Sequence, residues 1–153
     1  MEKYTELVRK VTNAECVVFD LDDTLCAPDW GLHWDQADRF EAIPAMVELA
    51  QMVKAHGYDI VIATARPSTY LVPTLKWLGD HFPEWNALYM ANAEVAAEAH
   101  VAKEGQLLAI ENHWDIAFWV DDSPANCRVI QSHGVVCLRP TRNDEYWANE
   151  GLL

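Results

Sequence analysis

An uninterrupted apolar run at residues 17–19 ends abruptly in three carboxylates, Asp20, Asp22 and Asp23, followed by the hydroxyl of Thr24. A short apolar run with such a boundary is typical of a buried strand in an open α/β sheet, where ligands bind beyond the carboxyl ends of the strands. Asp20 and Asp22 are one residue apart, so their charges repel, and a bound cation or a retained proton relieves the repulsion. The segment predicts a metal site, a nucleophile beside an acid, or both; the alternative is a polar turn after a buried strand.

The length of 153 residues suits a single domain over residues 1–153, large enough to bury a sizeable core. No apolar run approaches the roughly 20 residues that a membrane-spanning helix needs. The first residues lack the basic-then-apolar order of a signal peptide, so we expect a cytoplasmic protein with no membrane partner. The four cysteines form no Cys-x-x-Cys pair and the six histidines show no His-Glu-x-x-His spacing, which favours reduced core thiols over a zinc site.

The net charge of −13 limits the partners that the chain attracts. It favours solubility and the binding of cations, and it opposes long-range attraction of polyanions such as nucleic acid.

Strand-like and helix-like segments alternate along the chain. Tyr4, Leu7, Val8 and Val11 recur at helical spacing, which predicts a short amphipathic helix within residues 1–14. Beyond it, the sequence predicts strands at residues 16–19, 59–63, 87–90, 116–120 and 135–138, and helices at residues 44–56, 67–78, 101–111 and 124–133. The alternation predicts an α/β fold with a mainly parallel five-stranded sheet and helices on both faces, followed by a tail at residues 139–153.

Polar side chains follow three of these predicted strands, at the ends that a parallel sheet places on one edge. They are Asp20 and Asp22 after the first strand, Thr64 and Arg66 after the second, and Asp121 and Asp122 after the fourth, with Lys103 on the preceding helix. Chance explains one such strand end easily and three poorly.

These segments resemble the four motifs of the haloacid dehalogenase (HAD) superfamily, in the right order and over most of the chain. The motif residues are Asp20 to Leu25, Ile62 to Arg66, Lys103, and Val120 to Asn126. The resemblance implies a Rossmann-like three-layer sandwich and a Mg²⁺-dependent phosphohydrolase that works through an aspartyl-phosphate. In that family pattern Asp20 is the nucleophile, Asp22 the general acid/base, Thr64 and Lys103 hold the phosphoryl group, and Asp20, Asp22 and Asp121 form the metal site.

Physical chemistry agrees with these roles. A carboxylate nucleophile divides hydrolysis into two easier steps, phosphoryl transfer needs fixed positive charge, and Mg²⁺ prefers oxygen ligands. Each assignment has a structural alternative: Lys103 as a solvated helix lysine, and Asp121 and Asp122 as an acidic helix start. Asp122 is expected to support the metal site, and Asn126 either orients the aspartate pair or caps its own helix.

Many HAD enzymes carry an inserted cap domain, whereas here the predicted elements leave only a small flap loop at residues 26–43. An open site admits bulky substrates unless a partner chain covers it. Trp30 and Trp34 in this loop either stack on a nucleobase or pack the flap against the body. Residues 144–153 of the tail, with Tyr146 and Trp147, either dock on the body, cover the site or bind another subunit.

Within the superfamily, the sequence is most similar to the phosphatase domain of phage-type polynucleotide kinases. The similarity covers Thr64 to Pro67, Thr74, Trp77 and Leu78, Leu88 to Met90, and Val101 to Glu104. It implies a nucleotide or polynucleotide end as the phosphorylated substrate, with Arg66 either contacting phosphate or forming a salt bridge to the acidic cluster. A small metabolite or a phosphoprotein is the alternative substrate, and a receiver-like or catalytically silent binding domain is the alternative function.

Overall fold

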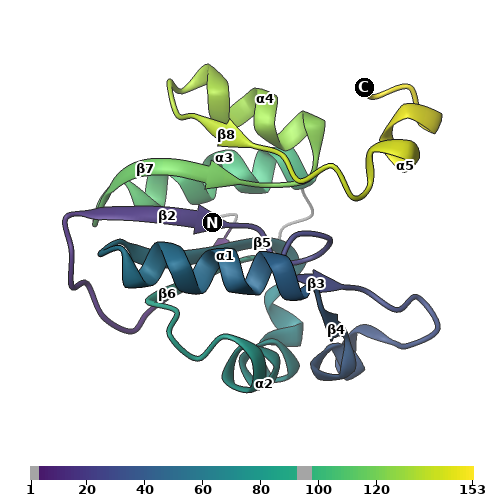
Figure 1. Cartoon of the computed structure of the whole chain (residues 1–153), viewed down its shortest axis with the longest axis horizontal. Helices are drawn as coiled ribbons and strands as arrows, with labels where there is room; N and C mark the ends of the chain where they lie inside the picture. Colours follow the sequence, from purple (N-terminus) through teal and green to yellow (C-terminus); the bar gives the residue numbers. More distant parts are fainter. Residues whose placement is uncertain (1–3, 93–97) are drawn as a thin grey trace.

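The computed structural model describes residues 4–92 and 98–153, and these form a six-stranded sheet in the order β1-β6-β5-β2-β7-β8 (Figure 1). The strands are β1 Tyr4–Val8, β2 Glu15–Phe19, β5 Asp59–Pro67, β6 Ala87–Ala91, β7 Asp115–Val120 and β8 Cys137–Leu138. All neighbouring pairs are parallel except β1 and β6. The predicted α/β fold with a mainly parallel sheet is confirmed, with one strand more than expected.

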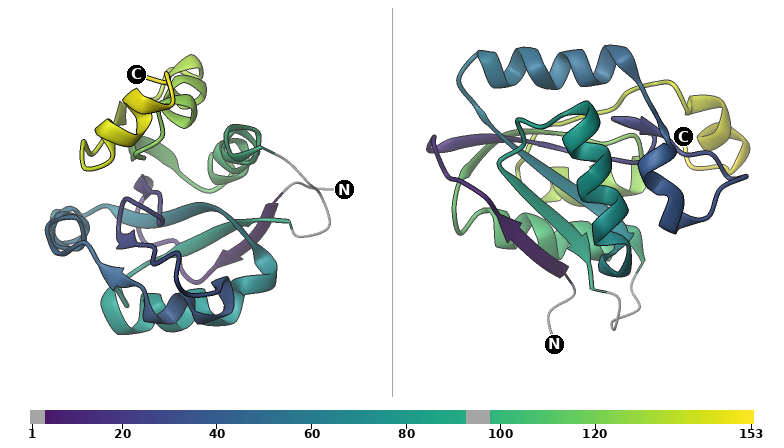
Figure 2. Two further views of the ribbon diagram at one scale, coloured as in Figure 1. Left: turned by 90° about the vertical axis from the view of Figure 1, so that its right-hand side faces the viewer. Right: turned by 90° about the horizontal axis from the view of Figure 1, so that it is seen from below.

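Helices cover both faces of this sheet, as predicted (Figure 2). The helices are α1 Pro44–Ala55, α2 Leu71–His81, α3 Ala99–Ile110, α4 Pro124–Ser132 and α5 Asp144–Asn149. One buried cluster joins the sheet to α1 and α2, and a second joins it to α3 and α4. Within the described residues, no helix is long and apolar enough to cross a membrane.

The central strand β2 contributes to both clusters at once. Val17 and Phe19 belong to the cluster beneath α1 and α2, while Cys16 and Val18 belong to the other. Because both faces of β2 are buried, its sequence is continuously apolar rather than alternating. All four cysteines are free and buried, as expected for reduced core thiols.

Residues 4–8 form a strand, so the prediction of a helix in this segment was wrong. β1 pairs antiparallel with β6, with Tyr4 opposite Ala91 and Val8 opposite Ala87. Aromatic and β-branched residues suit a strand as well as a helix, and the deciding partner strand lies about 80 residues away in the chain.

Prolines and glycines set the helix ends largely as predicted. Pro44 begins α1, and Gly57 follows it with a φ of 111°. Ser123 caps α4 by accepting a hydrogen bond from the backbone of Asn126. The expected helix start at Pro67 was wrong, because Pro67 is extended and closes β5; a 3-10 turn, η2 Ser68–Tyr70, precedes α2.

The flap (residues 26–43) is closed at its base by two short antiparallel strands, β3 Cys26–Ala27 and β4 Glu41–Ala42. Between them lies a 3-10 helix, η1 Trp34–Arg39, which packs on α2. The Trp77 indole of α2 fixes this packing by donating a 2.8 Å hydrogen bond to the Phe40 carbonyl. The flap stands at the same end of the sheet as the polar strand ends (Figure 1).

Candidate active site

The carboxyl ends of β2 and β5 meet at one pocket of about 230 Å³. Its lining is Asp20, Asp22, Trp34, Thr64, Ala65, Arg66, Pro67, Lys103 and Asn126. The pocket therefore brings together side chains from two strand ends, from the helices α3 and α4, and from the flap. Asp121 and Asp122 lie directly beside this pocket, since Lys103 and Asn126 both contact Asp121.

A buried cluster of three carboxylates lies at the base of the site. One oxygen from each of Asp20, Asp121 and Asp122 lies within 4.8 Å of the others. The predicted metal site contained Asp20, Asp22 and Asp121, so the side chain of Asp122 takes the place expected for that of Asp22. The reason is that Arg66 holds the Asp22 carboxylate elsewhere.

Lys103 bridges two members of this cluster from α3. Its Nζ lies 2.7 Å from Asp20 Oδ1 and 3.0 Å from Asp121 Oδ2, and the side chain is fully buried. Burial alone lowers the pKa of Lys103, but the carboxylates of Asp121 and Asp20 outweigh it and raise that pKa above its ordinary value. Lys103 is therefore a fixed cation of the site and not a solvated helix lysine.

One lysine does not balance three buried carboxylates. Burial and then the charge of Asp121 raise the pKa of Asp20 well above its ordinary value, although Lys103 acts in the opposite direction. Burial and Asp121 likewise raise the pKa of Asp122, to about 6. The cluster thus carries surplus negative charge that a cation or protons must neutralise.

The donor set around the cluster fits a cation that prefers oxygen ligands. Asn126 donates from Nδ2 to both oxygens of Asp121, at 3.2 and 3.3 Å, which leaves its Oδ1 on the other side of the amide. Over residues 4–92 and 98–153, that Oδ1 is one of three buried side-chain polar atoms without a hydrogen-bond partner. A buried, unsatisfied oxygen next to surplus carboxylates is the environment that a hydrated divalent cation satisfies. Asn126 also orients Asp121, one of the two roles considered for it.

Arg66 is committed to Asp22 and to α2. Its Nη2 lies 2.6 Å from Asp22 Oδ1, and its Nη1 donates to the Thr74 hydroxyl at 2.7 Å. The Trp34 ring centroid lies 5.1 Å from the guanidinium carbon and that of Phe40 5.8 Å, so the flap covers this ion pair. Arg66 thus forms a salt bridge to an acidic residue, one of the two alternatives considered for it, and it also links Asp22 to the flap.

Two hydroxyls complete the pocket. Thr64 is buried, and its Oγ1 accepts the backbone N–H of Arg66 at 3.1 Å. Thr24, which the sequence did not single out for a role, donates to Asp20 Oδ2 at 3.2 Å. Asp20 is therefore oriented from one side by Thr24 and from the other by Lys103.

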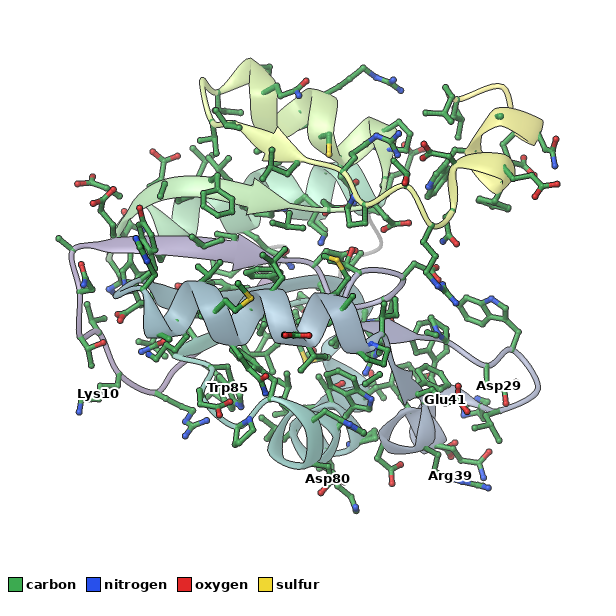
Figure 3. The ribbon with its side chains drawn as sticks, in the orientation of Figure 1. Lys10, Asp29, Arg39, Glu41, Asp80 and Trp85 are labelled. Carbon is green, nitrogen blue, oxygen red and sulfur yellow. The ribbon has the colours of Figure 1, made fainter. Side chains whose placement is uncertain are left out.

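The two flap tryptophans occupy different positions. Trp34 lines the site pocket and stacks on Tyr70, with 6.2 Å between ring centroids. Trp30 is 70% exposed and meets Trp34 edge-on at 5.5 Å. It lines a separate pocket of about 480 Å³ on the flap, together with Asp29, Arg39 and Glu41, which Figure 3 labels. Trp34 thus packs the flap, and Trp30 presents a free ring surface.

The segment after β8 also reaches the site, which the sequence reading did not predict. Arg139 Nη1 donates to the Asp122 carbonyl at 2.9 Å, and Asn143 Nδ2 lies 3.4 Å from Asp122 Oδ2. Arg142 Nη1 lies 3.3 Å from Asp23 Oδ1. The signal was available, because β8 neighbours β7 in parallel and the residues after it must leave at the same sheet edge. Residues 139–143, at the start of the tail, therefore contact the site.

The sequence of this chain also matches a known protein family. Residues 14–144 match the family model described as the polynucleotide kinase PNKP phosphatase domain. No curated protein sequence matches this chain.

Solved structures share the fold. A structure of the Pnkp1/Rnl/Hen1 RNA repair complex aligns with a TM-score of 0.77 and 20% identity over 89% of this chain. This chain spans only 45% of that relative's length. A HAD-like phosphatase from Mesorhizobium loti has a TM-score of 0.68 and 11% identity, with 88% of this chain and 78% of that one covered. D,D-heptose 1,7-bisphosphate phosphatase from B. bronchiseptica, solved with magnesium and phosphate, has a TM-score of 0.63 and 13% identity, with 88% and 86% covered.

These similarities cover the same residues that converge on the pocket. Because the family model spans Asp20, Thr64, Lys103 and Asp121 together, the chain belongs to the polynucleotide kinase PNKP phosphatase-domain family of HAD phosphatases, a family of phosphoric monoester hydrolases.

Proposed function

We propose that this chain is a Mg²⁺-dependent phosphatase that removes a terminal phosphate from a nucleotide or polynucleotide end through an aspartyl-phosphate on Asp20. The observation that carries the proposal is the placement of Asp20 between Lys103 and Thr24 at the base of a pocket lined by Thr64 and Asp22. A carboxylate held from both sides has little freedom to lose when it attacks phosphorus.

In the first step, an oxygen of Asp20 attacks phosphorus and the bond from phosphorus to the ester oxygen breaks. Asp22 gives its proton to the departing oxygen. In the second step, water attacks the phosphoryl group, Asp22 takes a proton from that water, and the bond to Asp20 breaks to release inorganic phosphate. Lys103 and the Thr64 hydroxyl stabilise the charge on the phosphoryl oxygens in both steps.

Asp20, Asp121 and Asp122 would hold the magnesium ion, and Asn126 would orient Asp121. When bound, Mg²⁺ neutralises the carboxylate cluster and the charge of the phosphoryl group. The surplus negative charge and the unpartnered Asn126 Oδ1 support this role.

The contacts of Arg66 support a positioning role. Because its guanidinium is buried and shared between Asp22 and Thr74, Arg66 fixes the orientation of the general acid/base more readily than it reaches substrate. Trp34 holds Arg66 from the flap side. Trp30, with its exposed ring, is the residue that would stack on a nucleoside.

Two observations support a nucleotide substrate: membership of the PNKP phosphatase-domain family, and a similar structure that is part of an RNA repair complex. The small flap leaves the pocket accessible to a chain end. The net charge of −13 favours a short substrate or a strand end over extended contact with a nucleic acid.

The test is phosphate release from nucleotides, 3′- and 5′-phosphorylated oligonucleotides, sugar phosphates, phosphopeptides and p-nitrophenyl phosphate, with Mg²⁺ and with chelator. We expect Mg²⁺-dependent release that Asp20→Asn abolishes. Asp80→Asn, an exposed aspartate on α2, is the matched control and retains activity. Protein quenched in acid during turnover carries one phosphoryl group on Asp20 by mass spectrometry. Full activity in Asp20→Asn contradicts the proposal, and preference for sugars or phosphopeptides replaces the nucleotide assignment.

A further inference from the structure

The basic residues at the center of the site have no capacity left for a second anionic group. Lys103 is shared between Asp20 and Asp121, and Arg66 between Asp22 and Thr74, and both side chains are buried. They serve the reacting phosphoryl group and the acid. A further phosphate on the substrate must therefore meet a cation nearer the surface.

Arg142 has the required position. It pairs with Asp23, which belongs to the catalytic loop (residues 20–24), and the next residue, Asn143, reaches Asp122 of the carboxylate cluster. Its side chain is 48% exposed. Among the lysines and arginines that the structure describes, Arg142 alone combines an ion pair to the catalytic loop with exposure of this extent.

The pairing of Arg142 with Asp23 is of a kind that a ligand displaces easily. It consists of a single contact at 3.3 Å between partly exposed groups, and such pairs are weak and screened by salt. A phosphate dianion offers the guanidinium two hydrogen bonds in place of one. When Arg142 exchanges Asp23 for a phosphate, the carboxylate that loses its partner is partly exposed, so no fully buried charge is left unpaired.

The flap stands on the opposite side of the catalytic loop from the segment after β8, residues 139–143 (Figures 1 and 2). The flap thus carries an aromatic pair, Trp34 in the site pocket and the exposed Trp30 against it, and the segment after β8 carries the cation Arg142. A nucleoside carries a ring that stacks and joins phosphates on its two sides. The aromatic pair can stack on the ring and Arg142 can bind a phosphate, so together they suit a nucleotide that has a second phosphate beyond the one being removed.

We infer that Arg142 is a specificity-determining residue that binds a second phosphate of the substrate, so that the site prefers a nucleotide phosphorylated on both sides of its sugar over a nucleoside monophosphate. This inference rests on the proposed phosphatase function. The required chemistry occurs in a free nucleoside 3′,5′-bisphosphate and at the phosphorylated end of a strand.

The experiment measures kcat/KM for a nucleoside 3′-monophosphate, the corresponding 3′,5′-bisphosphate and a 3′-phosphorylated dinucleotide. The wild type is expected to favour the substrates with a second phosphate, and a preference between those two substrates identifies the source. Arg142→Gln lowers the ratio of the second-phosphate substrates to the monophosphate by about tenfold, which is typical of one lost charge-assisted contact. Most of that change lies in KM.

Two further variants separate binding from other effects. Asp23→Asn raises the same ratio, because it removes the competing carboxylate, and asparagine tolerates the φ of 63° at this position. Arg128→Gln, at an exposed position of α4, controls for the change in net charge and leaves the ratio unchanged.

The outcomes are distinguishable. Absence of phosphate release from every substrate, including p-nitrophenyl phosphate, refutes the proposed function itself. Phosphatase activity with equal kcat/KM for mono- and bisphosphate refutes only the inference. If Arg142→Gln and Asp23→Asn lower kcat equally on all substrates, Arg142 merely tethers the tail, and the inference is also refuted.

Discussion

Replacing Lys103 by methionine removes the cation of the site and keeps the length of the side chain. In the wild type, Nζ lies 2.7 Å from Asp20 and 3.0 Å from Asp121, and none of the three residues is more than slightly exposed. Removing one partner of a buried ion pair costs about 3–5 kcal/mol, because the remaining charge is buried without compensation. For a chain of this length, we expect the melting temperature to fall by about 6–20 °C.

The assay is thermal unfolding in chelator, with and without added Mg²⁺, at pH 8 and pH 5. The pKa of Asp20 is already raised by burial, so protonation is its route to relief once Lys103 is absent. A raised folded-state pKa means that stability is present at low pH and lost as the pH rises, so the deficit of Lys103→Met is smaller at pH 5. Mg²⁺ restores part of it at pH 8.

Lys76→Met is the matched control, since Lys76 forms an exposed pair with Asp80 on α2, and exposed pairs contribute little. If Lys103→Met in chelator at pH 8 unfolds at the wild-type temperature, or falls no further than Lys76→Met, then Lys103 does not compensate the cluster and the reasoning is refuted.

Three further perturbations test other parts of the structure. In the wild type, burial and Asp121 raise the pKa of Asp122 to about 6, so the stability that its protonated form contributes below pH 4 is lost as the pH rises through 6. Asp122→Asn removes this titrating group. In chelator, the variant lacks that loss in urea titrations at pH 4 to 7, and an unchanged pH profile contradicts the assignment. Arg66→Lys loses the paired contacts to Asp22 and Thr74 and lowers kcat on p-nitrophenyl phosphate by about 10–100-fold. If the variant keeps the kcat of the wild type, Arg66 does not position Asp22. Burial raises the pKa of Asp59, but hydrogen bonds from Thr12, Trp114 and Asn13 outweigh it and lower that pKa, so its stabilisation is present at pH 7 and lost as the pH falls below 4. Asp59→Asn lowers the free energy of unfolding by about 2 kcal/mol at pH 7 and by less at pH 3. Equal effects at both pH values contradict the role of the ionised carboxylate as the stabilising form.

The elements that the sequence predicted well have local signals at their ends. Pro44 and Gly57 bracket α1, and Ser123 and Gly134 bracket α4, because backbone conformation at these positions depends on neighbouring residues alone. β1 carries no such signal. Its conformation is set by pairing with β6, and the spacing of its apolar residues is compatible with both structures.

At the site, too, local sequence signals predict some features and long-range contacts decide the others. The motif order predicted that the ends of three strands meet. Residues of β5 and after β2 line the pocket, and Asp121 after β7 contacts Lys103 and Asn126 beside it. Which carboxylate joins the cluster depends on tertiary contacts: Arg66 draws Asp22 away, and the chain after β8 reaches Asp122. The parallel direction of the last strand, which the sequence predicted, puts the residues after it at this sheet edge. Its place beside β7, which brings Arg142 to Asp23, is a pairing that residue spacing does not encode.

The packing of Arg66 beneath Trp34 and Phe40 divides the flap into two parts with different freedom to change in sequence and length. Trp34 and Phe40 contact the cation that orients Asp22, so an insertion between them shifts the general acid/base. Residues 28–33 lie outside that contact and include the exposed Trp30. Insertions and randomised libraries intended to change substrate preference should therefore be placed at the tip, where loop length is tolerated and the chemistry beneath is left in place.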